Sequence, residues 1–125
     1  MTDAPVASVM LAAPVDLSVL KSLVGEDLNV LRDVLEDFKR SKARIAADLR
    51  LACAAGEPAM VRSAAHKLKS SARAVGALAL GELCEALEGL GAAGDGAALA
   101  ERLPLFDEQI AAVDIAISQL LAVES

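Results

Sequence analysis

The sequence predicts an all-α protein, an antiparallel four-helix bundle with a short N-terminal cap helix. Hydrophobic residues make up 55 % of the 125 residues, mostly as alanine and leucine, while aromatic residues make up only 2 %. This composition favours helix over sheet. Apolar residues recur every three or four positions, which is the helical period, and no stretch shows the alternation of a strand. Glycine and proline separate the periodic stretches and mark the turns.

The N-terminal part divides into a lead-in and a short helix. Residues 1–13 have no apolar period and are expected to form a flexible lead-in, followed by one helical domain over residues 14–125. Asp16 is the predicted N-cap of the short helix, and Gly25 is its predicted end. A single apolar stripe lies between them, which suits a helix that caps one end of a bundle.

A long helix of about 27 residues is predicted from Leu28, with Asp27 as its N-cap. Lys42 is the one polar position in its apolar stripe. Gly56 and Pro58 end this helix and begin the next, because glycine is favoured after a helix and proline in a first turn.

Three further helices complete the prediction. The helix that begins at Pro58 should end at Gly76, and the next, with leucine every three or four residues, should end in the glycine-rich turn 91–96. The last helix contains Pro104, which should kink or split it. Four amphipathic helices with short turns bury their stripes most simply in an antiparallel bundle.

The helix from Pro58 carries the only histidine of the chain. Its predicted buried face consists of Val61, Ala65, Leu68, Ala72 and Val75. His66 lies roughly 200° around the helix from Leu68, so its imidazole should face solvent. Cationic and hydroxyl side chains should lie on the same outer face, namely Arg62, Ser63, Lys69, Ser70 and Arg73.

The net charge of −6 makes nucleic acid and anionic membranes unlikely partners. Residues 57–77 nevertheless carry a local charge of +3, which leaves −9 for the rest of the chain. This distribution indicates a local anionic partner, with an ordinary solvated helix face as the alternative.

No apolar run is long enough for a membrane span, and the N-terminus lacks the cationic start of a secretory signal, so a cytoplasmic protein is expected. Cys53 and Cys84 have no metal or redox spacing and are predicted to be buried free thiols.

Three runs together resemble the signature of histidine-containing phosphotransfer (HPt) domains, which is usually His-x-Leu-Lys-Gly-Ser. They are His66-Lys67-Leu68-Lys69-Ser70-Ser71, then Val75-Gly76-Ala77, then Leu83-Cys84-Glu85-Ala86-Leu87-Glu88. The resemblance covers nearly the whole chain and implies the same bundle. Ser70 departs from the family pattern, because it stands where the family most often has glycine. We expect Ser70 to modulate docking without abolishing function.

The resemblance implies a phosphorelay intermediate of two-component signalling. His66 would accept a phosphoryl group from a phospho-aspartate receiver domain and pass it to another receiver aspartate. A neutral imidazole can attack phosphorus without a separate base, and the family implies Nε2 as the reacting nitrogen. Lys69 matches the family's phosphoryl-stabilising lysine. Arg62, Ser63, Ser70 and Arg73 are candidates for partner binding, with solvated surface as the alternative for each.

The sequence shows no Walker loop, kinase loop or carboxylate cluster for Mg²⁺. We therefore expect a phosphoryl carrier and not an enzyme, with no cofactor of its own and with Mg²⁺ supplied by the receiver. Receiver domains and a hybrid sensor histidine kinase are the implied partners, and a monomer is expected. The alternative is a helical adaptor that binds a signalling protein without phosphorylation, which the serine at position 70 favours.

Overall fold

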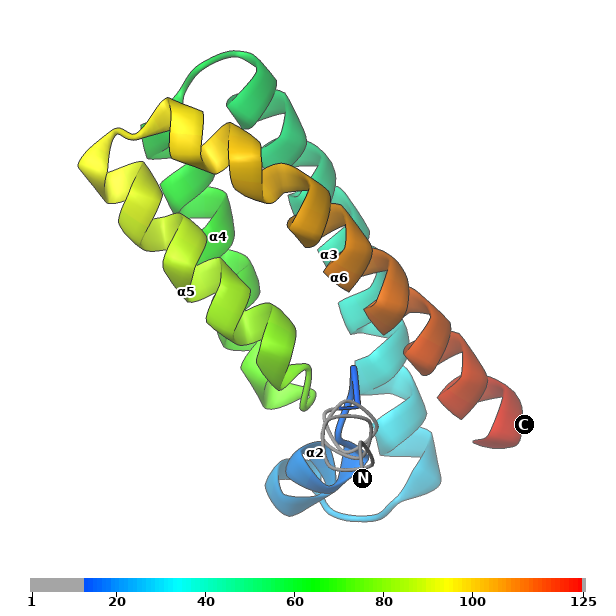
Figure 1. The fold of residues 1–125 in the computed structure, drawn as a ribbon. Helices are drawn as coiled ribbons and strands as arrows, with labels where there is room; N and C mark the ends of the chain where they lie inside the picture. The colour runs from blue at the N-terminus through cyan, green and yellow to red at the C-terminus, as the bar shows by residue number, and fades with distance from the viewer. Residues whose placement is uncertain (1–12, 125) are drawn as a thin grey trace, which may run out of the picture.

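The computed structural model describes residues 13–124, and these residues form helices and turns without any strand. The helices are α2 (Leu17–Val24), α3 (Leu28–Ala54), α4 (Pro58–Ala74), α5 (Leu78–Ala93) and α6 (Gly96–Glu124) (Figure 1). The predicted all-α class is confirmed. The expected lead-in lies outside the described residues except for Ala13. None of the helices in the described range combines the length and apolar character that crossing a membrane requires.

Helix α2 begins and ends where the sequence predicts. The Asp16 carboxylate accepts a hydrogen bond from the Ser18 N–H at 3.0 Å, and Gly25 follows the helix with a φ of 86°. The Asp16 N–H donates to the Gly76 carbonyl at 2.8 Å, which ties α2 to the α4–α5 turn. A Cβ on Gly76 would lie 2.0 Å from the Asp16 carbonyl oxygen, and the φ of Gly76 is 86°. Only glycine therefore fits this turn.

The long helices α3 and α4 bury the predicted faces. Helix α3 has 27 residues, and the Asp27 carboxylate caps it by accepting from the Asn29 N–H at 2.9 Å. Lys42, the polar position of its stripe, is fully buried, and its Nζ lies 2.5 Å from the Asp114 carboxylate of α6. In α4 the predicted inward residues are at most 2 % exposed, namely Val61, Ala65, Leu68, Ala72 and, just after the helix, Val75.

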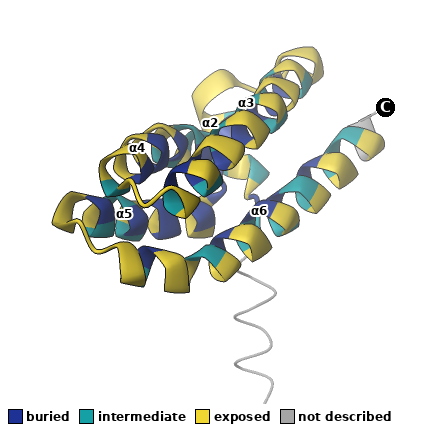
Figure 2. Ribbon diagram, turned by 90° about the horizontal axis from the view of Figure 1, so that it is seen from above, coloured by how far each residue is buried: buried dark blue, intermediate teal, exposed yellow. Residues whose placement is uncertain are grey.

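The end of α5 falls inside the predicted turn 91–96, and of the two outcomes expected at Pro104, a kink or a split, the split does not occur. Helix α5 does not end at Gly91 but continues to Ala93, where Gly94, with a φ of 71°, follows it. Gly91 stays helical because it packs against α4, where a Cβ would lie 2.7 Å from the Pro58 carbonyl oxygen. Pro104 does not split the last helix, since α6 is continuous. Both views instead show α6 bending in its first half, where Pro104 removes a backbone hydrogen bond (Figures 1 and 2).

The helices enclose one core. Helix α4 packs against α3 and α5, and α6 packs against α3 and α5, while α2 contacts α3 and α4 at one end (Figure 1). Buried residues line the facing sides of the helices and exposed residues cover the outer sides (Figure 2). Helix α4 thus has its inner face in the core and its outer face available for a site.

Candidate functional site

The site is built on the outer face of α4. Ala65 and Leu68 have no exposed surface, so this face of α4 is held in the core. His66 lies almost opposite Leu68 around the helix, so its side chain must point outward. Its side chain is 64 % exposed. The imidazole therefore projects from a rigid helix into solvent, where a reacting partner can reach it.

Two buried glycines of α5 let this helix pack directly beside this face of α4. A Cβ on Gly91 would lie 2.9 Å from the Arg62 backbone nitrogen, and a Cβ on Gly81 would lie 2.9 Å from the Arg73 Cγ. Both distances are shorter than a van der Waals contact allows. Glycine at these two positions lets α5 approach α4 above and below the level of His66. The close approach brings the side chain of Glu88 to the imidazole.

Glu88 connects the two most important candidate residues of α4. Its Oε2 lies 2.9 Å from Nδ1 of His66, and its Oε1 lies 2.7 Å from Nζ of Lys69. The Lys69 ammonium, followed by the His66 ring, holds the pKa of the Glu88 carboxyl below its usual value. Glu88 is therefore ionised at neutral pH and can only accept hydrogen bonds.

This contact determines which imidazole nitrogen is available for chemistry. Because the Glu88 carboxylate only accepts, Nδ1 of His66 must carry the proton that it donates. In a neutral ring the lone pair then resides on Nε2. The arrangement leaves the lone pair of Nε2 unengaged by Glu88, and Nε2 is the nitrogen that the family resemblance implies.

A second pair of charges lies further along the same two helices. A guanidinium nitrogen of Arg73 lies 2.7 Å from Oε1 of Glu85, and this contact holds the pKa of the Glu85 carboxyl below its usual value. The expectation of a simple basic face around His66 is therefore wrong. Carboxylates of α5 balance Lys69 and Arg73, because the charge count over residues 57–77 does not include the neighbouring helix.

The remaining candidates fall into two groups. Arg62 and Ser63 line an open hollow of about 440 Å³ together with His66 and Glu88. Ser70 is exposed on α4 but does not line this hollow, and neither does Arg73. The structure thus gathers the candidates that precede His66 around its ring.

Ser71 and the two cysteines lie outside the hollow around His66. Ser71 Oγ donates to the Leu68 carbonyl at 3.2 Å, so it bonds to the backbone of its own helix. Cys84 is buried as predicted, and burial raises the pKa of its thiol to about 12. The prediction for Cys53 is corrected, since this thiol is only half-buried at the end of α3. In residues 13–124 no group of three or more histidine, cysteine or acidic side chains has the geometry for a metal ion.

Glu88 lies at the site but was not predicted from the sequence as a site residue. Its signal was present, because Glu85 and Glu88 are three residues apart and share one side of α5. The pattern alone does not say which helix that side faces. The two glycine contacts that fix the rotation of α5 against α4 appear only in three dimensions.

Two comparisons with known proteins found matches to this chain. The family model of the Hpt domain matches residues 33–122, a range that contains all of α4 and α5. The crystal structure of histidine-containing phosphotransfer protein B (HptB) from Pseudomonas aeruginosa PAO1 is similar, with a TM-score of 0.80 and 24 % sequence identity. The similarity covers 87 % of this chain and 95 % of that chain, and it shows a shared fold. A comparison with curated proteins found no match.

Proposed function

This chain belongs to the Hpt domain family, and on that premise we propose that His66 is the residue that carries the phosphoryl group. Membership makes the chain a histidine phosphotransfer intermediate of two-component signalling. The observation that carries the proposal is the exposed imidazole whose Nδ1 is bound to Glu88. Nε2 is left free to attack.

The reaction that this geometry supports is an in-line transfer from an aspartyl phosphate of a receiver domain. Nε2 of His66 forms a bond to phosphorus as the bond from phosphorus to the acyl oxygen breaks, and the aspartate leaves as its carboxylate. The proton on Nδ1 stays in place, so the ring gains positive charge as the N–P bond forms. The Glu88 carboxylate beside Nδ1 stabilises that charge. Transfer to a second receiver aspartate is the reverse of these steps.

Lys69 is proposed to stabilise the phosphoryl group. Its Nζ shares the Glu88 carboxylate with His66 and lies one turn along α4, and its side chain is 19 % exposed. A flexible lysine can exchange its carboxylate partner for a phosphoryl oxygen without movement of the helix. Lys69→Ala should keep the fold, measured by circular dichroism, and shorten the lifetime of the phosphorylated form.

The decisive experiment is transfer of radiolabel from a phosphorylated receiver domain. The wild-type protein should acquire an acid-labile label, and His66→Gln should acquire none. Equal labelling of the two proteins would refute the assignment. If His66→Ala kept full signalling in cells while Arg73→Glu abolished it, the chain would be a helical adaptor instead.

Several finer features belong to the same proposal. Contacts between successive long helices support an antiparallel four-helix bundle that α2 caps, in one domain over residues 14–125.

We infer a carrier without ATP binding of its own, which acts as a cytoplasmic monomer. Its partners are receiver domains, including that of a hybrid sensor histidine kinase, and the receiver supplies Mg²⁺. Arg62, Ser63, Ser70 and Arg73 are the proposed partner contacts on α4.

A further inference from the structure

The cations on the outer face of α4 fall into two sets. Lys69 and Arg73, which follow His66, are paired with carboxylates of α5. Arg62 and Lys67 form no ion pair with any of the residues that the structure describes. The unpaired positive charge of this face therefore lies at Arg62 and Lys67.

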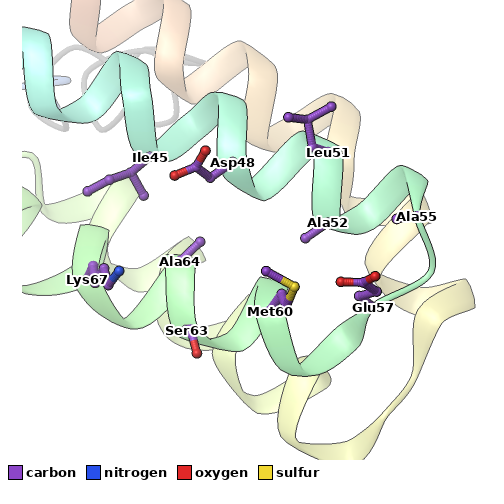
Figure 3. A pocket seen from close by; sticks show the side chains of 10 residues that line it. All are labelled: Ile45, Asp48, Leu51, Ala52, Ala55, Glu57, Met60, Ser63, Ala64 and Lys67. Atoms are coloured by element: carbon purple, nitrogen blue, oxygen red, sulfur yellow. The ribbon is translucent and has the colours of Figure 1, made fainter.

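Both unpaired cations line the open hollow of about 440 Å³ around His66. Ser63 lines it too, and within the described part of the chain its hydroxyl makes no hydrogen bond. Figure 3 shows this hydroxyl pointing away from α3, whereas Ala64 on the same turn points toward α3. The hollow thus places a guanidinium, an ammonium and a hydroxyl, all hydrogen-bond donors, beside the imidazole.

The start of the Arg62 side chain is fixed by the contact between α4 and α5. A Cβ on Gly91 would lie 2.9 Å from both the Cβ and the backbone nitrogen of Arg62. Arg62 precedes His66 by four residues, a spacing that makes two helical side chains neighbours. Ala59 lines the hollow about one turn further back, and its small side chain leaves room for a group on the imidazole.

The orientation of the ring leaves Nε2 on the side of these donors. Glu88 lines the hollow from α5 and holds Nδ1 of His66 at 2.9 Å. Because the two ring nitrogens point in different directions, Nε2 is turned away from that carboxylate. The α4 side of the hollow is therefore the side open to a group on Nε2.

The charges of the site match those of a phosphoryl group. Such a group on a side chain carries about two negative charges at neutral pH. The charge of Lys69 is already balanced by Glu88. Arg62 and Lys67 supply two further positive charges, and a planar guanidinium can bind two phosphoryl oxygens at once.

We propose that the hollow around His66 is a phosphoryl-binding site, in which the guanidinium of Arg62 binds oxygens of the phosphoryl group on Nε2. Ser63 and Lys67 are the further donors. This inference rests on the proposed function and adds a role that lasts after the receiver has left. The hollow stabilises the free phosphorylated protein, so it shifts the equilibrium of transfer as well as its rate.

The test is the equilibrium constant for transfer between a phosphorylated receiver and this protein. It is taken from the distribution of radiolabel at the plateau, at protein concentrations where few complexes are present. A contact made only in the complex changes how fast the plateau is reached and leaves the plateau unchanged. Arg62→Gln should shift the equilibrium toward the receiver by about tenfold, the effect of losing a hydrogen bond to a charged group.

Arg102→Gln is the matched control. Arg102 is an exposed arginine of α6 that does not line the hollow, so its loss removes the same charge at a distance from His66. This variant should leave the equilibrium constant unchanged.

A second measurement uses the wild-type protein alone. In proton–nitrogen NMR, phosphorylation of His66 should move the Nε–H resonance of Arg62 and leave that of Arg102 in place. If the Arg62 resonance stays in place, its guanidinium does not bind the phosphoryl group and the proposal fails.

The remaining outcomes overturn the proposal in distinguishable ways. An unchanged equilibrium constant in Arg62→Gln would refute the phosphoryl site and leave the proposed function standing. A slower approach to the same plateau would make Arg62 a partner contact only. An equal shift in Arg102→Gln would show a general effect of charge. Failure of the wild type to accept label from the receiver would refute the proposed function, and the phosphoryl site with it.

Discussion

Nδ1 of His66 lies 2.9 Å from Oε2 of Glu88, and this contact joins α4 to its neighbour α5. The contact orients the imidazole, fixes the proton on Nδ1 and places a negative charge beside a ring that becomes positive during transfer. Lys69 binds the other oxygen of the same carboxylate. One acidic side chain therefore connects the nucleophile with the cation proposed to stabilise its product.

Glu88→Ala should slow phosphorylation of His66. Loss of a charge-assisted hydrogen bond to the ring should reduce the transfer rate by roughly 5- to 30-fold. Glu85→Ala is the matched control, because Glu85 pairs with Arg73 and not with His66. It should change the rate by less than about twofold. Rapid-quench transfer from a phosphorylated receiver measures both, and equal rates in the two variants would contradict the role of Glu88.

The Glu88 carboxyl should titrate below its usual value of 4.5, because its charged form binds Lys69 and His66. A lowered folded-state pKa stabilises the protein above pH 4.5, and this contribution is lost as the pH falls through the folded-state value. Lys69→Met should therefore raise the pKa of Glu88 toward 4.5. Lys67→Met, on the same helix, should leave it in place. NMR titration of the side-chain carboxyl carbons tests this, and equal responses to both variants would count against the ion pair.

Gly91→Ala should destabilise the fold, because its Cβ would lie 2.7 Å from the Pro58 carbonyl oxygen and 2.9 Å from the Arg62 backbone nitrogen. Such overpacking costs about 1–3 kcal/mol. Gly89→Ala is the matched control on the same helix, since a Cβ there meets nothing within 4 Å. It should stabilise α5 by about 0.5–1 kcal/mol. Urea unfolding gives both values, and two changes of the same sign would show that α4 and α5 are not as close as described.

Asp114→Ala should destabilise the fold more than Asp107→Ala. Asp114 pairs with Lys42, which is fully buried, so its removal leaves a buried ammonium without this partner. Such losses cost about 3 kcal/mol or more. Asp107 pairs with Arg50, whose side chain is 40 % exposed, and this pair should contribute under about 1 kcal/mol. Thermal unfolding of both variants should separate them, and equal shifts would indicate that the ammonium of Lys42 is hydrated.

The features that were predictable from sequence depend on local structure. Asp16, Asp27 and Gly25 cap or end their helices through contacts within a few residues, so their positions were predictable. The exposure of His66 followed from its angular position around α4, nearly opposite the buried Leu68. Gly91 was grouped with the turn 91–96 although it lies within α5, because its role is to admit the backbone of α4, which lies far away in sequence.

At the site, too, features within one helix were predictable and contacts between helices were not. The residues of α4 were found because their spacing places them on one face, whereas Glu88 reaches His66 only across a helix interface. The surplus positive charge expected around His66 was misjudged for the same reason. Pairing of Arg73 with Glu85 depends on how α5 is rotated against α4, and helical periodicity along α5 does not define that rotation.

The most direct measurement is the chemical identity of the phosphorylated nitrogen. Nitrogen-15 NMR of the protein labelled by a phosphorylated receiver distinguishes the two phosphohistidine isomers through the couplings of the ring nitrogens to phosphorus. We expect phosphorus on Nε2 of His66, with the Nδ1 proton retained and bound to Glu88. Phosphorus on Nδ1, or a labelled protein without phosphohistidine, would contradict it.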